Sequence, residues 1–159
     1  MNRCVVCWGF ALVSCLLCGA DWLGFRGPSG ASVSTGTPPP AAWQEKENVA
    51  WKARLPGRGP SSPIVVEGKV FVTASAGARQ ERLFVLCFDA DTGTELWRRE
   101  FWATGRTLTH PMSSVAAPTP ASDGKRIFAF YSSNDLVCLD LAGNLHWYRG
   151  LAFDYPKAG

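Results

Sequence analysis

The sequence lacks three features that would each point to a class of protein. Its 16 lysines and arginines are scattered among 13 acidic residues, for a formal net charge of +3. It therefore has no clustered basic face, the mark of a nucleic-acid binder. No stretch beyond residue 20 shows a convincing helical period, which favours an all-β mature chain. The apolar run at residues 4–20 spans 17 residues, fewer than the roughly 20 that a membrane-spanning helix needs.

The first twenty residues have the pattern of an export signal. A positively charged start at Arg3 precedes the apolar run, which ends in Cys18-Gly19-Ala20, two small residues flanking a free position, before the polar Asp21. This pattern predicts a secretory signal peptide cleaved after Ala20, and therefore a periplasmic or extracellular protein. Two alternatives involve the membrane. The segment is retained as an anchor, or a lipobox-like Leu-Val-Ser-Cys leaves a lipidated Cys15.

The remaining sequence divides into two parts. Residues 21–42 are rich in glycine and proline and predict an extended lead-in, with Trp22 and Phe25 as its main anchors. Residues 43–159 alternate short apolar runs, rich in β-branched and aromatic residues, with turn residues, as strands do. The segment 43–55 is predicted to be a strand of an incomplete unit. The clearest other strands are predicted at 70–73, 83–88, 127–131 and 136–139.

These strands repeat as a group. Residues 61–71 are echoed by 116–128, and residues 87–97 by 138–147, the second copy having a shorter turn. Three tryptophans, Trp51, Trp97 and Trp147, follow at spacings of 46 and 50 residues. Four short strands in each period of about 40–50 residues predict β-propeller blades.

The repeated turn has a structural explanation. Asp89 can accept hydrogen bonds from the turn backbone, and Gly93 can take a positive φ without strain. Trp97 then offers a broad apolar surface to a neighbouring blade. The spacing Asp89-x-Asp91-x-Gly93 also resembles the start of a calcium loop. Glu95 comes too early for the late bidentate ligand of such a loop, so we favour a structural turn.

The cysteines and histidines give no catalytic pattern. Cys4, Cys7, Cys15 and Cys18 have zinc-knuckle spacing, but an export segment offers no polar metal shell in the mature protein. Cys87 and Cys138 hold equivalent repeat positions, about 10 Å apart across a sheet interface. A disulfide needs Cα atoms within about 7 Å, so both are predicted to be free and buried.

His110 lies in the long connection between the repeats, without a carboxylate or nucleophile at a recognisable spacing. The neighbouring Ser113 and Ser114 lack a motif that would orient a base. We expect His110 to be structural or solvent-exposed, and His146 to lie on the surface. Arg26 is either a conformational anchor or a ligand contact, and the sequence does not decide between these roles.

Residues 87–97 resemble the repeat of pyrroloquinoline-quinone (PQQ) type propellers, with a small residue, Asp89, the Thr92-Gly93 turn and Trp97. The second copy keeps Asp140, Gly143 and Trp147 but lacks the threonine. The opening at residues 21–30 and the segment 109–124 are similar to an exported bacterial subgroup. The resemblance covers roughly 130 residues. It implies a ring of seven or eight blades, each of about 45 residues. We therefore expect this chain to be an N-terminal fragment with about two four-stranded antiparallel blades.

The resemblance does not extend to the cofactor. Quinoprotein dehydrogenases with this type of repeat hold PQQ and calcium near the propeller axis. They also have a catalytic aspartate and a disulfide between adjacent cysteines, so the resemblance would imply the same features here. This sequence has no adjacent cysteine pair, and no cofactor residue of that family maps onto it. We therefore predict no catalytic, cofactor-binding or metal-binding residue here. PQQ and calcium are expected only for a longer parent.

Three functions follow from this reading. The first is a non-catalytic propeller that binds protein partners as an assembly scaffold in the cell envelope. It resembles the outer-membrane assembly lipoprotein of the same repeat type. The second is a fragment of a PQQ-dependent oxidoreductase, which leaves enzyme status open, and the third is a truncated product without a function of its own. Neither nucleic acid nor, unless lipidation or anchoring holds the chain there, a membrane is expected as a partner.

Overall fold

The computed structural model describes residues 21–34, 38, 40–44 and 46–154. The predicted signal segment and its four cysteines, including Cys15, lie outside the described residues, and so does the end of the chain beyond Asp154. Within the described part, no helix is long and apolar enough to cross a membrane.

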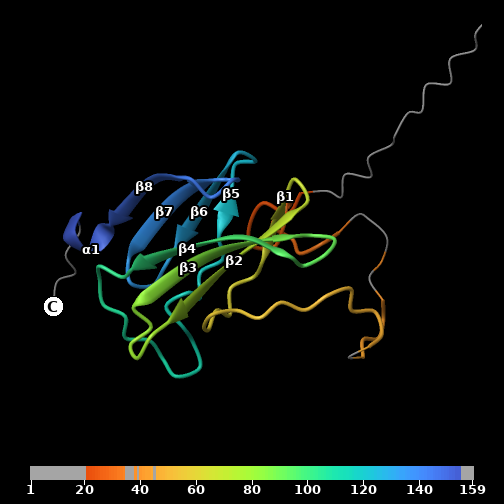
Figure 1. Ribbon diagram of the computed structural model, residues 1–159, viewed down its shortest axis with the longest axis horizontal. Helices are drawn as coiled ribbons and strands as arrows, with labels where there is room; N and C mark the ends of the chain where they lie inside the picture. Colours follow the sequence, from red (N-terminus) through yellow and green to blue (C-terminus); the bar gives the residue numbers. More distant parts are fainter. Residues whose placement is uncertain (1–20, 35–37, 39, 45, 155–159) are drawn as a thin grey trace, which may run out of the picture.

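The described chain is all-β apart from one short terminal helix, as predicted (Figure 1). Two four-stranded sheets follow each other along the sequence, and in each the strands pair with their sequence neighbours. The first sheet contains β1 (Ile64–Val66), β2 (Lys69–Ala76), β3 (Arg82–Asp89) and β4 (Glu95–Trp102). The second contains β5 (Ala121–Ser122), β6 (Arg126–Phe130), β7 (Asp135–Asp140) and β8 (Leu145–Gly150), followed by α1 (Leu151–Asp154).

The two sheets have equivalent registers. Phe71 pairs with Cys87, which pairs with Trp97, and in the second sheet Phe128 pairs with Cys138 and then Trp147. In both sheets the pairing of the last two strands shifts directly after the cysteine. An irregularity at the same place in both sheets is what a structural repeat requires. The predicted repeat and its antiparallel strands are confirmed, and each sheet forms one propeller blade.

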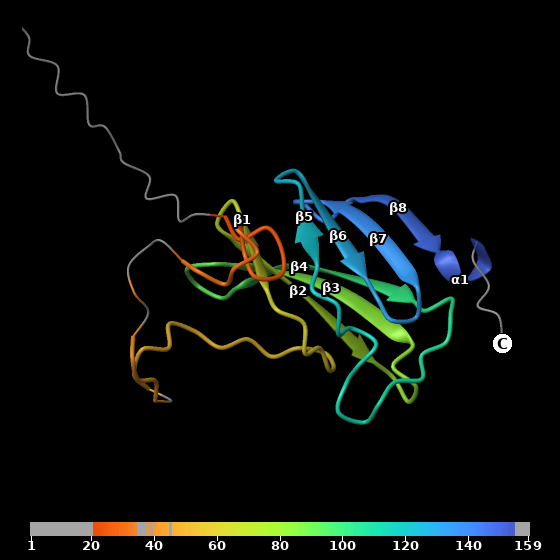
Figure 2. The same cartoon turned by 180° about the vertical axis from the view of Figure 1, so that it is seen from behind.

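The blades pack face to face around a shared apolar core, and Figures 1 and 2 show the two sheets from opposite sides. Fully buried side chains from both sheets contribute to it, among them Leu83, Val85, Ile127 and Tyr131. The hydroxyl of Tyr131 donates a hydrogen bond of 2.8 Å to the carbonyl of Phe84 in the other blade. Within the described residues each blade packs against one other blade, so it buries one face in the shared core and turns the other outward.

The lead-in joins the inner strands of the two blades. Trp22 and Val65 exchange two backbone hydrogen bonds, and the carbonyl of Leu23 accepts one from the amide of Ser122. Trp22 is therefore an anchor, as predicted, and Leu23, which packs against the core, is one that the sequence did not reveal. Phe25 is 67% exposed, so its predicted role as an anchor is wrong. It lies in a tight turn whose backbone is closed by the next residues rather than by either blade.

The prediction of a strand within residues 43–55 is also wrong. Its described residues form only an isolated bridge, between Gln44 and Glu47. A strand is stable when it pairs with the backbone of a neighbour, and this segment attaches mainly through side chains. Trp51 and Leu55 pack on the outer face of the first blade, over Phe84 and Phe88. The segment is a covering strap rather than part of a sheet.

Candidate functional site

The repeated aspartates are used to build turns. The Asp89 carboxylate accepts hydrogen bonds from the amide and the hydroxyl of Thr92, both at 2.8 Å, and from the amide of Asp91. These bonds, the Thr92 hydroxyl first, lower the pKa of the Asp89 carboxyl. Gly93 has a φ of +70°, a backbone conformation that favours glycine. The predicted structural turn is confirmed.

In the second repeat turn, an asparagine takes the place of the missing threonine as the side chain that donates a hydrogen bond to the aspartate. The Asp140 carboxylate accepts bonds from the backbone and side-chain nitrogens of Asn144, each at 2.8 Å, and from the amide of Ala142. The side chain of Asn144 is the largest influence lowering the pKa of Asp140. Both aspartates therefore stabilise their own turns. Within the described ranges, no group of three or more histidine, cysteine, aspartate or glutamate side chains could hold a metal ion.

Each repeat turn also receives a tryptophan from the preceding repeat position. The indole of Trp51 lies against Gly93 and donates a 2.8 Å hydrogen bond to the carbonyl of Ala90. Trp97 lies against Gly143 in the same way and donates to the carbonyl of Leu141 at 3.1 Å. The predicted apolar cover by tryptophan is confirmed. Its hydrogen bond was not predicted, although the regular spacing of the tryptophans could have suggested equivalent partners.

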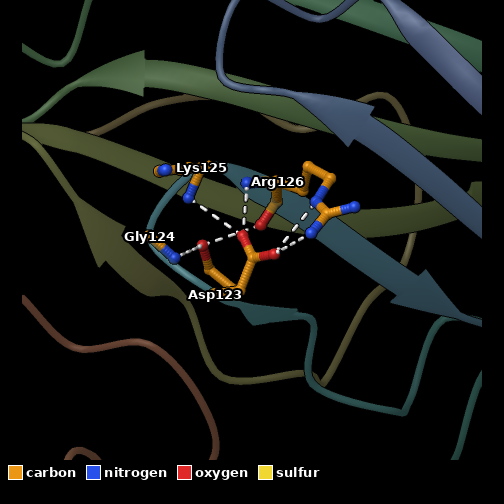
Figure 3. Close-up of polar contacts among 5 residues, drawn as sticks. Asp123, Gly124, Lys125 and Arg126 are labelled. Carbon is orange, nitrogen blue, oxygen red and sulfur yellow. Dashed lines mark hydrogen bonds and ion pairs between the residues drawn. The ribbon is translucent and has the colours of Figure 1, made fainter.

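A third turn, between β5 and β6, uses an aspartate in a similar way (Figure 3). Asp123 accepts hydrogen bonds from the amides of Lys125 and Arg126 and forms an ion pair with the Arg126 guanidinium at 2.8 Å. The backbone bonds, from Lys125 first, lower the pKa of Asp123. This turn is solvent-exposed, so its ion pair adds little stability.

A groove of about 600 Å³ lies at the opposite end of the blades. It separates the tip of the β2–β3 hairpin from the connection between β4 and β5, and is lined by Ala78, Arg79, Gln80, Gly105, Arg106, Thr107, Leu108 and Thr109. Two arginines make this groove basic. No sequence motif predicts this groove, because its walls come from two loops that only the folded structure brings together.

Gln80 fixes the connection beside the groove. Its side-chain oxygen accepts hydrogen bonds from the hydroxyl of Ser75 and the amide of Val115, and its nitrogen donates to Thr109 at 3.2 Å. Arg58 donates a further bond to the carbonyl of Pro111 at 2.9 Å. Along this tethered connection, Leu108 is 74% exposed and Met112 is 86% exposed.

A buried carboxylate joins the two blades near the same end. Asp135 is fully buried and accepts hydrogen bonds from the hydroxyls of Thr104, Ser133 and Tyr148 and from the amide of Thr104. Burial first, and then the bond to Asp135, raise the pKa of Tyr148. Tyr148 also contacts the first blade, through the carbonyl of Trp102 at 2.8 Å. Sequence reasoning missed this network because Thr104 and Tyr148 lie 31 and 13 residues from Asp135.

The two histidines lie at the surface, as predicted. His110 is exposed, and its Nδ1 accepts a hydrogen bond from the amide of Met112. His146 is exposed on β8. Ser114 is buried and, among the described atoms, its hydroxyl lacks a hydrogen-bond partner; Ser113 lies beside it in the turn after His110. The described contacts bring neither serine to a histidine base.

Arg26 and the two cysteines have structural positions. Arg26 has a φ of +66° and bonds Ser32 through both its side chain and its carbonyl, so it closes the first loop as a conformational anchor. Cys87 and Cys138 are free and buried, as predicted. Burial raises the pKa of Cys87 to about 12 and also raises that of Cys138.

The sheets, their shared register and the tryptophan-capped turns define the class: a repeat protein made of PQQ-type β-propeller blades. A family model described as outer membrane protein assembly factor BamB matches residues 26–155. The chain belongs to this family.

Comparison with solved structures finds a likeness to the quinohemoprotein alcohol dehydrogenase from Comamonas testosteroni. The two are 20% identical, with a TM-score of 0.45, over 65% of this chain and 14% of that protein. The chain thus corresponds to a small part of the length of that enzyme. No curated protein matches the sequence.

Proposed function

We propose that this chain is a non-catalytic scaffold that binds a protein partner in the cell envelope through the tethered β4–β5 connection. The main support for this proposal is the exposure of Leu108 and Met112 on a loop that Gln80 and Arg58 hold in place. Large apolar side chains on a fixed loop are suited to recognition, because little conformational entropy is lost when they are buried by a partner.

The use of the aspartates also supports a binding role. Three aspartates accept hydrogen bonds from their own turns: Asp89, Asp140 and Asp123. A fourth, Asp135, is already hydrogen-bonded between the blades. A carboxylate needed as a catalytic base or metal ligand would have to give up those bonds. The family name, an outer membrane protein assembly factor, agrees with a partner in the envelope. An exported location is part of this proposal.

The proposal is tested by recovery of a partner from envelope extract with the tagged full chain. The double variant Leu108→Ser and Met112→Ser should lose a partner that the unmodified chain retains. Lys125→Ser is the matched control, since Lys125 is exposed on the β5–β6 turn at the other end of the blades. Equal recovery by the double variant, or no specific partner at all, would count against the proposal.

A second experiment distinguishes a non-catalytic scaffold from a quinone-binding protein. We expect that PQQ added with calcium to the full chain changes neither its absorption spectrum nor its thermal unfolding temperature. A cofactor that bound only the folded state would raise that temperature with its concentration. A saturable rise would therefore contradict the non-catalytic assignment.

A further inference from the structure

The groove at the end of the blades brings together positive charge from two loops. Both of its walls belong to the part of the chain that forms the two blades. Residues 78–80 lie at the tip of the β2–β3 hairpin, and residues 105–109 lie in the connection from β4 to β5, beside it in both views (Figures 1 and 2). Arg79 and Arg106 stand on opposite walls, and no acidic residue is among the described residues that line the groove.

Arg106 is the less compensated of these two cations. It is exposed, and its side chain forms no ion pair or hydrogen bond with any described residue. The charge of Arg79 is partly balanced by Glu81, whose carboxylate accepts a 2.8 Å hydrogen bond from the Arg79 amide. Backbone hydrogen bonds, from its own amide first, lower the pKa of the Glu81 carboxyl, so it is ionised at neutral pH. Arg106 is therefore the cation available to a ligand.

The polarity of the hydrogen bonds around Gln80 leaves Thr109 as a donor. The amide of Val115 can only donate, so the Gln80 atom that it meets at 3.1 Å is the side-chain oxygen. The Gln80 side-chain nitrogen therefore donates to the Thr109 hydroxyl, at 3.2 Å. A hydroxyl that accepts such a bond keeps its own proton for another acceptor. Because Thr109 lines the groove, a ligand with an oxygen acceptor there can receive that proton.

The segment that carries Arg106 is attached on both sides. Before it, the amide and hydroxyl of Thr104 donate hydrogen bonds to the buried Asp135. Gly105 packs so closely on the carbonyl of Ser133 that a Cβ there would collide with it. The hydrogen bond between Gln80 and the threonine three residues after Arg106 holds the other side. A segment that is already fixed loses little conformational entropy when a ligand binds.

We propose that this groove binds an acidic, partly apolar peptide segment of the protein partner. A carboxylate of that segment pairs with Arg106 and accepts from Thr109, since guanidinium and carboxylate groups form strong charge-assisted hydrogen bonds. A neighbouring apolar side chain packs on Leu108, which lines the groove and is 74% exposed. A peptide fits better than a nucleic acid, because a phosphate backbone offers nothing to cover Leu108. This inference rests on the proposed function, whose partner it describes chemically.

Fluorescence anisotropy with synthetic peptides tests the groove directly. The probe is a short peptide of alternating glutamate and leucine with an uncharged fluorophore, and the comparison peptide has glutamine in place of glutamate. The full chain should bind the glutamate peptide at least about tenfold more tightly, and added salt should reduce this preference by screening the charges. Arg106→Gln should abolish the preference. Lys125→Gln, which makes the same change of charge on the exposed β5–β6 turn, is the matched control and should keep it.

Equal affinity for the two peptides would overturn the proposal, as would a preference for glutamate that survives in Arg106→Gln. Tighter binding of a single-stranded oligonucleotide with the same fluorophore would show a phosphate site and overturn it as well. The comparison of the two peptides uses the unmodified chain, so it does not depend on any variant folding correctly.

Recovery from envelope extract separates this inference from the proposed function. A partner that is lost by the double variant Leu108→Ser and Met112→Ser, but retained by Arg106→Gln, would support the proposed function and overturn the acidic-segment inference. A preference for glutamate that depends on Arg106, in a chain that recovers no partner, would support the acidic-peptide groove although the proposed function had failed.

Discussion

At the scale of single residues, Asp135 has the least expected environment. A fully buried carboxylate is costly unless hydrogen bonds satisfy it. Here hydroxyls from three different segments, at Thr104, Ser133 and Tyr148, provide those bonds. Because Tyr148 also bonds the carbonyl of Trp102, the network fastens the second blade to the end of β4.

Removing this carboxylate should therefore destabilise the whole chain. We expect Asp135→Ala to reduce the free energy of unfolding by about 2–4 kcal/mol, since it leaves buried donors without their acceptor. Asp91→Ala, at an exposed position in the first repeat turn, should change it by no more than about 0.5 kcal/mol. Urea denaturation measures both. Similar losses in the two variants would mean that the network is not a structural link.

The buried thiols give a second prediction at this scale. Burial raises the pKa of Cys87 to about 12 and also raises that of Cys138, and the thiolate is the reactive form. Iodoacetamide should therefore leave both unmodified at neutral pH until the protein is unfolded. Peptide mass spectrometry reads each site separately. Rapid labelling of either cysteine in the folded chain would show that its blade opens.

Sequence reasoning succeeds at this scale where the chemistry is local. The roles of Asp89, Gly93 and Trp97 could be predicted because their partners lie within a few residues or at a regular repeat. Asp135 could not, since the Thr104 that bonds it lies 31 residues away. Phe25 was wrongly predicted to be an anchor because apolar character alone does not show which way a turn points a side chain.

At the scale of elements, two turn glycines allow the stability cost of backbone strain to be distinguished from the cost of a steric clash with a tryptophan. Gly124 and Gly143 both have positive φ, +86° and +84°. A Cβ at Gly124 would meet open space, whereas at Gly143 it would collide with the Trp97 ring. Gly124→Ala should cost about 1 kcal/mol through backbone strain. Gly143→Ala should cost a further 1–3 kcal/mol or so through overpacking. Equal losses on thermal unfolding would contradict the tryptophan dock.

The turn aspartates predict an acid sensitivity. An unfolded aspartate titrates near pH 3.9, and the pKa values of Asp89 and Asp140 are lower in the folded state. Their stabilisation is therefore complete above about pH 5, and it is lost as the pH falls from about 4 through the folded pKa values. Asp89→Asn with Asp140→Asn should lose less stability between pH 7 and pH 3 than the unmodified chain. The same loss in both would contradict this assignment.

Most strands could be predicted from the sequence because apolar runs and turn residues mark their ends. The predicted strand 70–73 lies within β2, and the predicted strand 83–88 lies within β3. The segment 43–55 differs because a strand depends on a pairing partner as well as on its own composition. The repeat spacing still placed Trp51 correctly, as its indole occupies the equivalent turn without a strand to carry it.

At the scale of the molecule, the repeat predicted two adjacent blades but not how they are joined. The lead-in at Trp22 and Leu23 ties the inner strands β1 and β5, and Asp135 ties the other end. The groove lies between residues 78–80 of one loop and 105–109 of another. Its location depends on the three-dimensional packing of two loops, so no pattern along the chain could reveal it.

The central claim is that the tethered β4–β5 connection contacts a protein partner. Photo-crosslinking in cells that express the full chain tests this most directly, with a crosslinking residue in place of Met112 or, as the control, Lys125. These two exposed positions lie at opposite ends of the blades. The account predicts a discrete adduct with another protein from position 112 and none from position 125. Equal adducts from both positions, or none from position 112, would contradict it.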